Sequence, residues 1–240
     1  MTDVLARLLE RDTTLWPEGN VAKTRLGWLD IPQRMRREAA AITSWADTVT
    51  AATVVLIGMG GSSLGPEVLR AAVGDTRLVV LDTTDPATVA GVDLDDALII
   101  VSSKSGTTLE VRALLAHCWD RLPDPSRYAA VTDPGTGLHD LAQERGFSRI
   151  FVNDPDIGGR YSVLSSFGLV PAAVAGVDIG ALLDAAALAD LVAAAELGVA
   201  MGEAARDGRD KLTIVVPQAF AAFGLWVEQL VAESTGKRGT

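Results

Sequence analysis

Five short apolar runs alternate with amphipathic segments through the middle of the chain. The runs are rich in β-branched residues and lie at 53–57, 77–81, 97–101, 127–131 and 148–152. Each run is too short and too apolar for an exposed helix, so each predicts a strand. The segments between them have helical periodicity, at 64–73, 107–121 and 136–145. Apolar strands that alternate with helices indicate a doubly wound parallel α/β sheet of five strands, with helices on both faces.

The two flanks of this sheet region have helical patterns of their own. Apolar residues recur at helical spacing near the N-terminus, and Pro17, Gly19 and Gly27 interrupt the pattern. We therefore expect residues 1–50 to form a helical arm and residues 51–179 to form the α/β domain.

The region after position 180 resembles the start of another unit. The pattern predicts an alanine-rich helix at about 181–206, a buried strand at 211–217 and a further helix at about 219–234. One strand and one helix cannot enclose a core. Residues 180–240 are thus expected to be a linker helix and the truncated start of a second domain, which either packs on the first sheet or belongs to a longer sequence.

Composition excludes several classes of function. The chain has 240 residues, with 21 Lys and Arg against 31 Asp and Glu, so its formal charge is −10. Such an acidic chain is a poor general binder of nucleic acid or of an anionic membrane. One cysteine, Cys118, excludes an internal disulfide framework, and two histidines leave little material for a zinc centre. We expect a soluble cytoplasmic protein that binds neither nucleic acid nor membrane.

The first apolar run leads into a glycine-rich loop, GMGGSSLG, at 58–65. Backbone N–H groups in such a turn face an anion, and the following helix N-terminus adds partial positive charge. A P-loop would need a lysine after Gly65, where Pro66 stands instead. A sugar-phosphate loop would use the hydroxyls of Ser62 and Ser63 as extra donors, and a tight turn without any ligand is the simplest alternative.

A dinucleotide-binding loop remains a competing interpretation. Gly58 and Gly60 fit its fingerprint, but Ser63 stands at the third glycine position. Asp82 ends the next predicted strand, where an acidic residue would bind a ribose. A nucleotide-dependent oxidoreductase is therefore kept as an alternative.

The third run ends in a second loop rich in hydroxyl groups, SSKSGTT, at 102–108. Hydroxyls and helix N-terminal amides are the donors that a phosphate monoester needs. A dinucleotide site has no use for a second loop of this kind. In the simplest alternative Thr107 or Thr108 only caps the following helix, and one or two of the five hydroxyls are expected to do so.

Four motifs, in this order along the chain, resemble one family. GMGGSSLGPEVL (58–69) and SSKSGTTLE (102–110) resemble the sugar isomerase (SIS) fold. DIGGRYSVLSSFGLVPAAVAGVD (156–178) and QLVAESTGK (229–237) are similar to signature segments of the glucose-6-phosphate isomerase family. The resemblance spans positions 58–237 and implies an SIS-type fold and isomerisation of sugar phosphates in glycolysis and gluconeogenesis.

The resemblance also assigns roles to individual residues. It implies that Glu233 is the catalytic base and that Arg160 lies near the sugar C1 and C2 atoms. It implies that Gly159 and Gln229 contact the sugar. The positions that match the family's phosphate-binding residues are Gly61, Ser62, Ser103, Lys104, Ser105 and Thr108.

These residue types suit the chemistry. Converting an aldose phosphate to a ketose phosphate moves a proton between C2 and C1 through a cis-enediol. One carboxylate, here Glu233, can take and return that proton, and a fixed cation such as Arg160 can stabilise the enediolate. The reaction requires no metal and no organic cofactor. A lone glutamate near a helix end is usually only a solvated carboxylate, and Arg160 could be a structural ion-pair residue, so the surrounding motifs carry both assignments.

The sequence also departs from the family pattern. Members of that family take a ring-opening histidine, downstream of the glutamate, from the neighbouring subunit, and His117 and His139 lie upstream of Glu233. The second loop has Gly106 where the best-known members carry an aromatic residue. We expect the 240-residue chain to be nearly inactive alone but to bind sugar phosphates weakly.

The resemblance implies a homodimer in the full-length form and leaves open a transaldolase as a fused or separate partner. A non-catalytic SIS module that binds a sugar phosphate is the alternative function.

Overall fold

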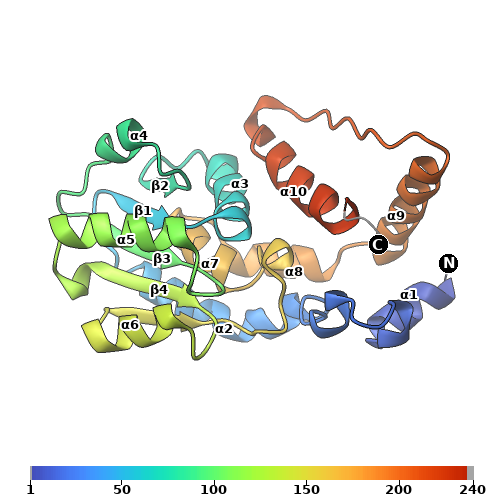
Figure 1. Ribbon diagram of the computed structural model, residues 1–240, viewed down its shortest axis with the longest axis horizontal. Coiled ribbons are helices and arrows are strands. Elements are labelled where there is room, and N and C mark those ends of the chain that lie inside the picture. The colour runs from blue at the N-terminus through green and yellow to red at the C-terminus, as the bar shows by residue number, and fades with distance from the viewer. Residues whose placement is uncertain (1, 237–240) are drawn as a thin grey trace.

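The computed structural model of the protein describes residues 2–236 and has a five-stranded parallel sheet at its centre (Figure 1). The strands are β1 (Val54–Ile57), β2 (Leu78–Leu81), β3 (Leu98–Ser102), β4 (Tyr128–Thr132) and β5 (Arg149–Val152). Their order is β2-β1-β3-β4-β5, and every neighbouring pair is parallel. The predicted doubly wound sheet is confirmed.

Ten α-helices lie among the described residues 2–236. Those around the sheet are α2 (Ile31–Ala46), α3 (Leu64–Val73), α4 (Pro86–Ala90), α5 (Leu109–Arg121), α6 (Gly137–Arg145) and α7 (Ser166–Val174). The remaining ones are α1 (Thr2–Leu9), α8 (Ile179–Ala187), α9 (Leu191–Arg206) and α10 (Phe223–Thr235). In this part of the chain no helix has the length and apolar character that a membrane crossing requires.

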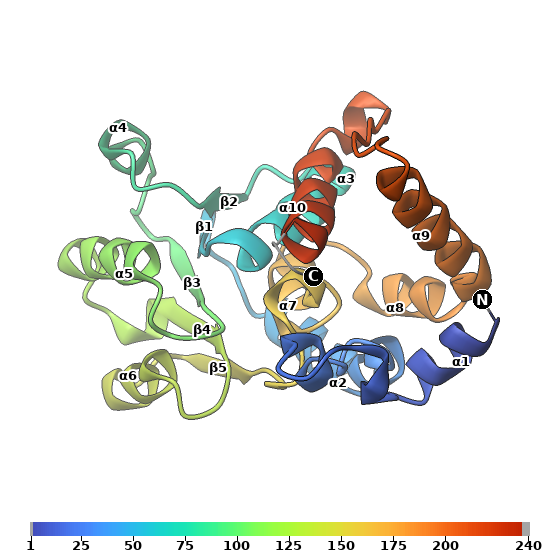
Figure 2. The ribbon, with the colours of Figure 1, turned by 45° about the vertical axis from the view of Figure 1, so that its right-hand side comes forward.

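Alternate residues of each strand enter two separate cores, one on either face of the sheet. Val54 and Leu56 of β1 pack with α2, α7 and α8, whereas Val55 and Ile57 pack with α5 and α6. Figure 2 shows α5 and α6 on one side of the sheet and α2 and α7 on the other. Because both faces are covered, most strand positions are apolar, as the sequence pattern indicated. The exceptions stand at strand ends, at Ser102, Thr132 and Arg149.

The N-terminal arm is fixed to the loop that follows β5. Leu26 forms an isolated antiparallel bridge with Ile157, and Trp28 stacks on Tyr161 with ring centroids 5.2 Å apart. The guanidinium of Arg34 on α2 bonds to the Asp154 carboxylate. Burial opposes ionisation of Asp154, but this bond and one from the Asp156 amide outweigh it and lower the pKa of the carboxyl. The arm therefore has a fixed position beside the sheet.

Two expectations for the C-terminal region are wrong. The single helix expected at 181–206 is divided into α8 and α9, because Asp190 accepts hydrogen bonds from the amides of Val192 and Ala193 and caps a new helix. The segment 211–217 is not a strand, and Val215 within it is 90% exposed. No strand of the described residues runs beside this segment, so its backbone has nothing with which to form a ladder.

The helix after that segment packs against the α/β domain. α10 begins at Phe223, four residues later than expected, and it contacts α3 and the turn that carries Arg160. Figure 1 shows α10 and α9 as two arms joined by the long segment between them. Whether residues 180–240 begin a second domain stays a prediction.

Candidate functional site

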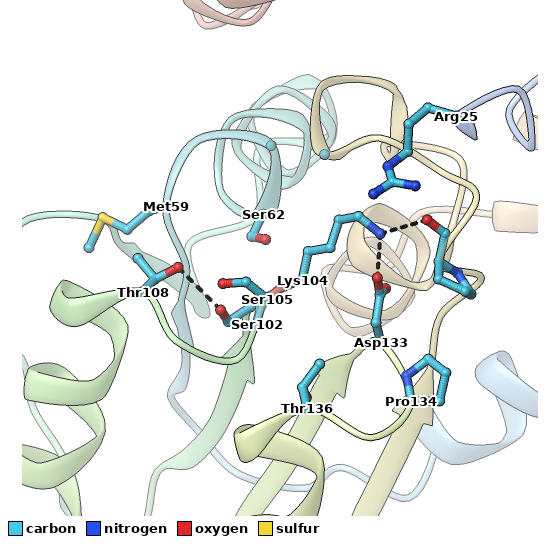
Figure 3. A pocket seen from close by; sticks show the side chains of 14 residues that line it. Arg25, Met59, Ser62, Ser102, Lys104, Ser105, Thr108, Asp133, Pro134 and Thr136 are labelled. Atoms are coloured by element: carbon cyan, nitrogen blue, oxygen red, sulfur yellow. Dashed lines mark hydrogen bonds and ion pairs between the residues drawn. The ribbon is translucent and has the colours of Figure 1, made fainter. Parts of the chain in front are cut away.

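A cavity of about 480 Å³ opens at the carboxyl ends of the strands (Figure 3). In the sheet, β2 lies on one side of β1 and β3 lies on the other side. The loops after β1 and β3 therefore diverge here, and such a switch point is where parallel α/β sheets bind their ligands. Both loops that the sequence analysis singled out meet at this place.

All six residues expected to bind phosphate line this cavity. They are Gly61, Ser62, Ser103, Lys104, Ser105 and Thr108, and Gly159 lies on the same wall. The cavity also has lining residues that the sequence analysis did not assign, among them Arg25, Asp133 and Thr136. Arg25 comes from the N-terminal arm, whose sequence has no motif that could have pointed to it.

Three helices begin at the cavity or next to it: Thr108 and Thr136 line it, and Ser63 follows the lining residue Ser62. Ser63, Thr108 and Thr136 precede the first residues of α3, α5 and α6 respectively. The amides in the first turn of a helix have no partners within it and carry partial positive charge. Their convergence favours an anion in the cavity without any need for net positive charge.

The hydroxyl groups of the second loop do not serve as helix caps. Thr108 occupies the N-cap position of α5, yet its side chain makes no capping hydrogen bond. Its hydroxyl instead lies 3.3 Å from the Ser103 hydroxyl. Ser105 Oγ accepts hydrogen bonds from the amide and hydroxyl of Thr107, at 3.2 and 3.1 Å. The expectation that Thr107 or Thr108 caps the helix is therefore wrong, because the loop turns the Thr107 hydroxyl towards Ser105 and the Thr108 hydroxyl towards Ser103.

Two glycines allow these loops to pack closely. A Cβ atom on Gly61 would lie 2.0 Å from the backbone oxygen of Gly159. Gly106 has a φ of +66°, and a Cβ there would lie 2.8 Å from the Leu138 amide at the start of α6. A side chain at position 106 would separate the second loop from α6, which explains why no aromatic residue stands there.

Lys104 is a paired cation. Its ammonium group donates to the Asp133 carboxylate and, at 3.1 Å, to the backbone oxygen of Pro155. Asp133 is buried and also accepts a hydrogen bond from Asn153 at 3.1 Å. The lysine side chain is thereby held across the cavity, with its charge largely balanced.

The other expected site residues gather beside this cavity rather than in its wall. The Nε atom of Arg160 lies 3.8 Å from a carboxylate oxygen of Glu233. Gln229, one turn earlier on α10, donates to the other oxygen at 3.3 Å. Gly60 faces Gln229, since a Cβ on Gly60 would lie 2.6 Å from its amide nitrogen. Thus the glycine-rich loop, Arg160 and Glu233 meet, while Lys237 at the end of the last motif lies outside the described residues.

Three other residues considered in the sequence lie outside the cavity wall. His117 and His139 are on α5 and α6 and do not line the cavity. Asp82, the acidic residue that a dinucleotide site would use, is exposed beyond β2 and also lies outside the cavity wall. Asp82 follows Leu81, the strand partner of Ile57, so it stands beside the start of the glycine-rich loop but outside the cavity that the two loops share.

Comparison with known proteins decides the family. Residues 29–197 match the family model described as phosphoglucose isomerase. The chain belongs to the phosphoglucose isomerase family. This match includes both loops and Arg160 and ends before Gln229 and Glu233.

Curated relatives agree with this membership. The chain is 33% identical to the glucose-6-phosphate isomerase of Rubrobacter xylanophilus, with 92% of this chain and 59% of the relative covered. It is 35% identical to that of Thermosynechococcus vestitus, with 77% and 40% covered. The chain thus spans about half the length of the curated relatives it matches.

Solved structures share the fold. A hypothetical protein of Thermus thermophilus superposes with a TM-score of 0.75 at 29% identity, covering 98% of this chain and 61% of the other. The glucose-6-phosphate isomerase of Chlamydia trachomatis gives a TM-score of 0.63 at 24% identity, covering 96% and 49%. The family and the α/β fold indicated by the motifs are confirmed.

Proposed function

We propose that this chain binds the phosphate of a hexose 6-phosphate and supplies the carboxylate that interconverts glucose 6-phosphate and fructose 6-phosphate. One observation carries the proposal: a cavity that is lined by hydroxyls, and at which or beside which three helices begin, lies next to the paired side chains of Arg160 and Glu233. The first feature suits a phosphate monoester, and the second suits proton transfer at a neighbouring carbon.

The phosphate is held by the two loops. The backbone amide of Gly61 and the hydroxyls of Ser62, Ser103, Ser105 and Thr108 act as donors. Lys104 adds a charge that Asp133 and the Pro155 carbonyl keep in place. Gly159 and Gln229 contact the sugar part of the substrate, since Gly159 lines the cavity and Gln229 faces the glycine-rich loop from α10.

The proton transfer uses Glu233 as the base. Its carboxylate removes the C2 proton of the open-chain aldose, a cis-enediol forms, and the same carboxylate delivers the proton to C1. The guanidinium of Arg160 stabilises the negative charge that develops on the enediolate oxygens. Gln229 holds one carboxylate oxygen of Glu233. As a purely structural ion pair, Arg160 and Glu233 would contribute little, because Glu233 is 56% exposed.

We propose that ring opening of the cyclic substrate needs a group from outside the described residues, because neither His117 nor His139 lines the cavity. The 240-residue chain alone is then expected to bind sugar phosphates and to turn them over slowly at most. The full-length form is proposed to be a homodimer in the cytoplasm. A transaldolase as a fused or separate partner stays a prediction.

Calorimetric titration of the 240-residue chain with 6-phosphogluconate, fructose 6-phosphate and NAD tests the binding step. Both sugar phosphates are expected to bind, and NAD is not. Failure of both sugar phosphates to bind overturns the proposal, and binding of NAD alone would support the oxidoreductase interpretation.

A turnover measurement distinguishes the proposed isomerase from the alternative, a non-catalytic module that binds a sugar phosphate. A coupled assay measures turnover of fructose 6-phosphate by the wild type and by Glu233→Gln in matched preparations. Activity in the wild type alone assigns the catalytic step to Glu233. Binding of the sugar phosphate without turnover in any preparation favours the non-catalytic module. Substantial turnover by the 240-residue chain alone would contradict the expected need for an outside group.

A further inference from the structure

We propose that Arg25 is a further substrate-binding residue, which donates from its guanidinium to the anionic group of a sugar phosphate bound in the cavity. This inference rests on the proposed function, because it names an additional contact to the same class of ligand. It assigns a binding role to the N-terminal arm, which is otherwise a packing element.

Arg25 is placed where such a contact can form. It lines the cavity and is exposed. Figure 3 shows its guanidinium directed into the cavity, on the side where Lys104 reaches Asp133. One terminal nitrogen donates to the backbone oxygen of Thr24 at 2.7 Å, and the other nitrogens of the guanidinium make no hydrogen bond to residues 2–236.

The charges of the cavity single out this residue. Lys104 and Arg25 are the cations in the cavity wall, and Asp133 balances Lys104. Arg25 forms no ion pair with any carboxylate among residues 2–236. It therefore supplies the unbalanced positive charge of a site within a chain of net charge −10. A phosphate dianion has the complementary charge, and a planar guanidinium matches two of its oxygens.

The backbone that carries Arg25 is held in place before any ligand arrives. Leu26, the next residue, is bridged to Ile157, and its amide donates to the Asp156 carboxylate at 3.2 Å. Two residues further on, Trp28 stacks on Tyr161. Tyr161 follows Arg160 directly, so the arm and the proposed enediolate-stabilising turn form one unit. Ordering of this backbone costs nothing on binding, which favours a productive contact.

The family match does not assign this role. It begins at residue 29, so Arg25 lies outside it. The proposal depends on the position and charge of the side chain.

Calorimetric titration of the 240-residue chain tests the contact, with inorganic phosphate and 6-phosphogluconate as probes at low salt. Arg25→Gln is expected to weaken both interactions about tenfold, the scale of one charge-assisted hydrogen bond. Arg25→Lys is expected to recover part of the loss, because it keeps the charge but loses the planar fork. Arg121→Gln is the matched control, since Arg121 ends α5 roughly 18 Å along the helix from its start.

Three results overturn the inference. If Arg25→Gln binds the probes as tightly as the wild type does, Arg25 makes no contact with the ligand. This result leaves the proposed function intact. An equal loss in Arg121→Gln shows a general charge effect instead of a contact. No binding by the wild type overturns both the inference and the proposed function, so the two failures are distinguishable. Thermal unfolding of each variant shows whether a loss comes from misfolding.

Discussion

The carboxylate of Glu233 lies 3.8 Å from the Nε atom of Arg160, although α7, α8 and α9 separate the two residues along the chain. Their surroundings differ. The Arg160 side chain is 21% exposed and that of Glu233 is 56% exposed. One terminal nitrogen of Arg160 is buried without a hydrogen-bond partner among the described residues. The arginine is therefore fixed by packing, whereas the glutamate is half exposed and its two carboxylate oxygens face Gln229 and Arg160.

Removing the charge of Glu233 should abolish proton transfer and spare binding. In a preparation that turns over fructose 6-phosphate, Glu233→Gln is expected to lower kcat by a factor on the order of 10²–10⁴, the usual contribution of a general base. Affinity for 6-phosphogluconate should stay within about twofold, because the phosphate donors lie in the two loops. The coupled assay and calorimetric titration measure these two quantities.

Glu228→Gln is the control, because Glu228 is an exposed glutamate on the same helix. It should leave kcat unchanged. Retained activity in the Glu233 variant, or an equal loss in the Glu228 variant, would contradict the role proposed for Glu233.

A methyl group on Gly61 should disturb both the fold and the site. The added Cβ would lie 2.0 Å from the Gly159 oxygen, so the two loops must move apart. Overpacking of this kind costs about 1–3 kcal/mol of unfolding free energy. Gly61→Ala is expected to lose stability in that range and to bind 6-phosphogluconate more weakly, as urea unfolding and calorimetry can measure.

Gly198→Ala tests whether the contact, and not the residue type, causes the loss. Gly198 lies on α9 with nothing within 4 Å of an added Cβ. Because alanine is favoured over glycine inside a helix, this change should stabilise the protein by about 0.5–1 kcal/mol. Equal effects of the two substitutions would rule out the explanation from close packing.

The Thr108 hydroxyl should matter for binding and little for stability. It makes no capping bond to α5 and lies in the cavity wall. Thr108→Val is expected to weaken 6-phosphogluconate binding several-fold, about the value of one neutral hydrogen bond. Its unfolding free energy should change by less than about 0.5 kcal/mol.

Asp190→Ala should show the opposite pattern. The Asp190 carboxylate accepts hydrogen bonds from two amides at the start of α9, far from the cavity. Loss of this cap is expected to cost about 1 kcal/mol of stability and to leave binding unchanged. A large stability loss in Thr108→Val would show that this hydroxyl is structural after all.

Cys118 should be inert in the folded protein. It is fully buried, and burial raises the pKa of its thiol from 9.0 to about 11. At pH 8 the thiolate is then about one part in a thousand, so an aromatic disulfide reagent should react only after unfolding. Rapid labelling of the native chain would contradict this burial.

The same shift predicts a pH dependence of stability. The raised pKa favours the neutral thiol in the folded state. The contribution of the Cys118 thiol to the free energy of unfolding is therefore complete below about pH 9 and is lost as the pH rises towards 11. Compared with Cys118→Ala, the wild type should lose about 2–3 kcal/mol of unfolding free energy across this window. Parallel pH profiles for the two proteins would refute the shift.

The hydrophobic pattern was sufficient for the sheet and its main helices. All five strands begin within one residue of their predicted positions, because a strand covered on both faces is apolar over most of its length. The same pattern failed at 211–217, where an apolar run has no neighbouring strand among the described residues. Strand formation depends on a partner, and a local pattern does not reveal whether one is present.

The sequence by itself determined the parallel α/β fold, the family and the two loops, since each follows from local periodicity or from a contiguous motif. Only the tertiary structure decided that Thr108 leaves its helix uncapped, that Asp133 balances Lys104 and that Arg25 reaches the cavity from the arm. These features depend on contacts between segments far apart in the chain. Their energies are set by distance and burial, which residue order alone does not specify.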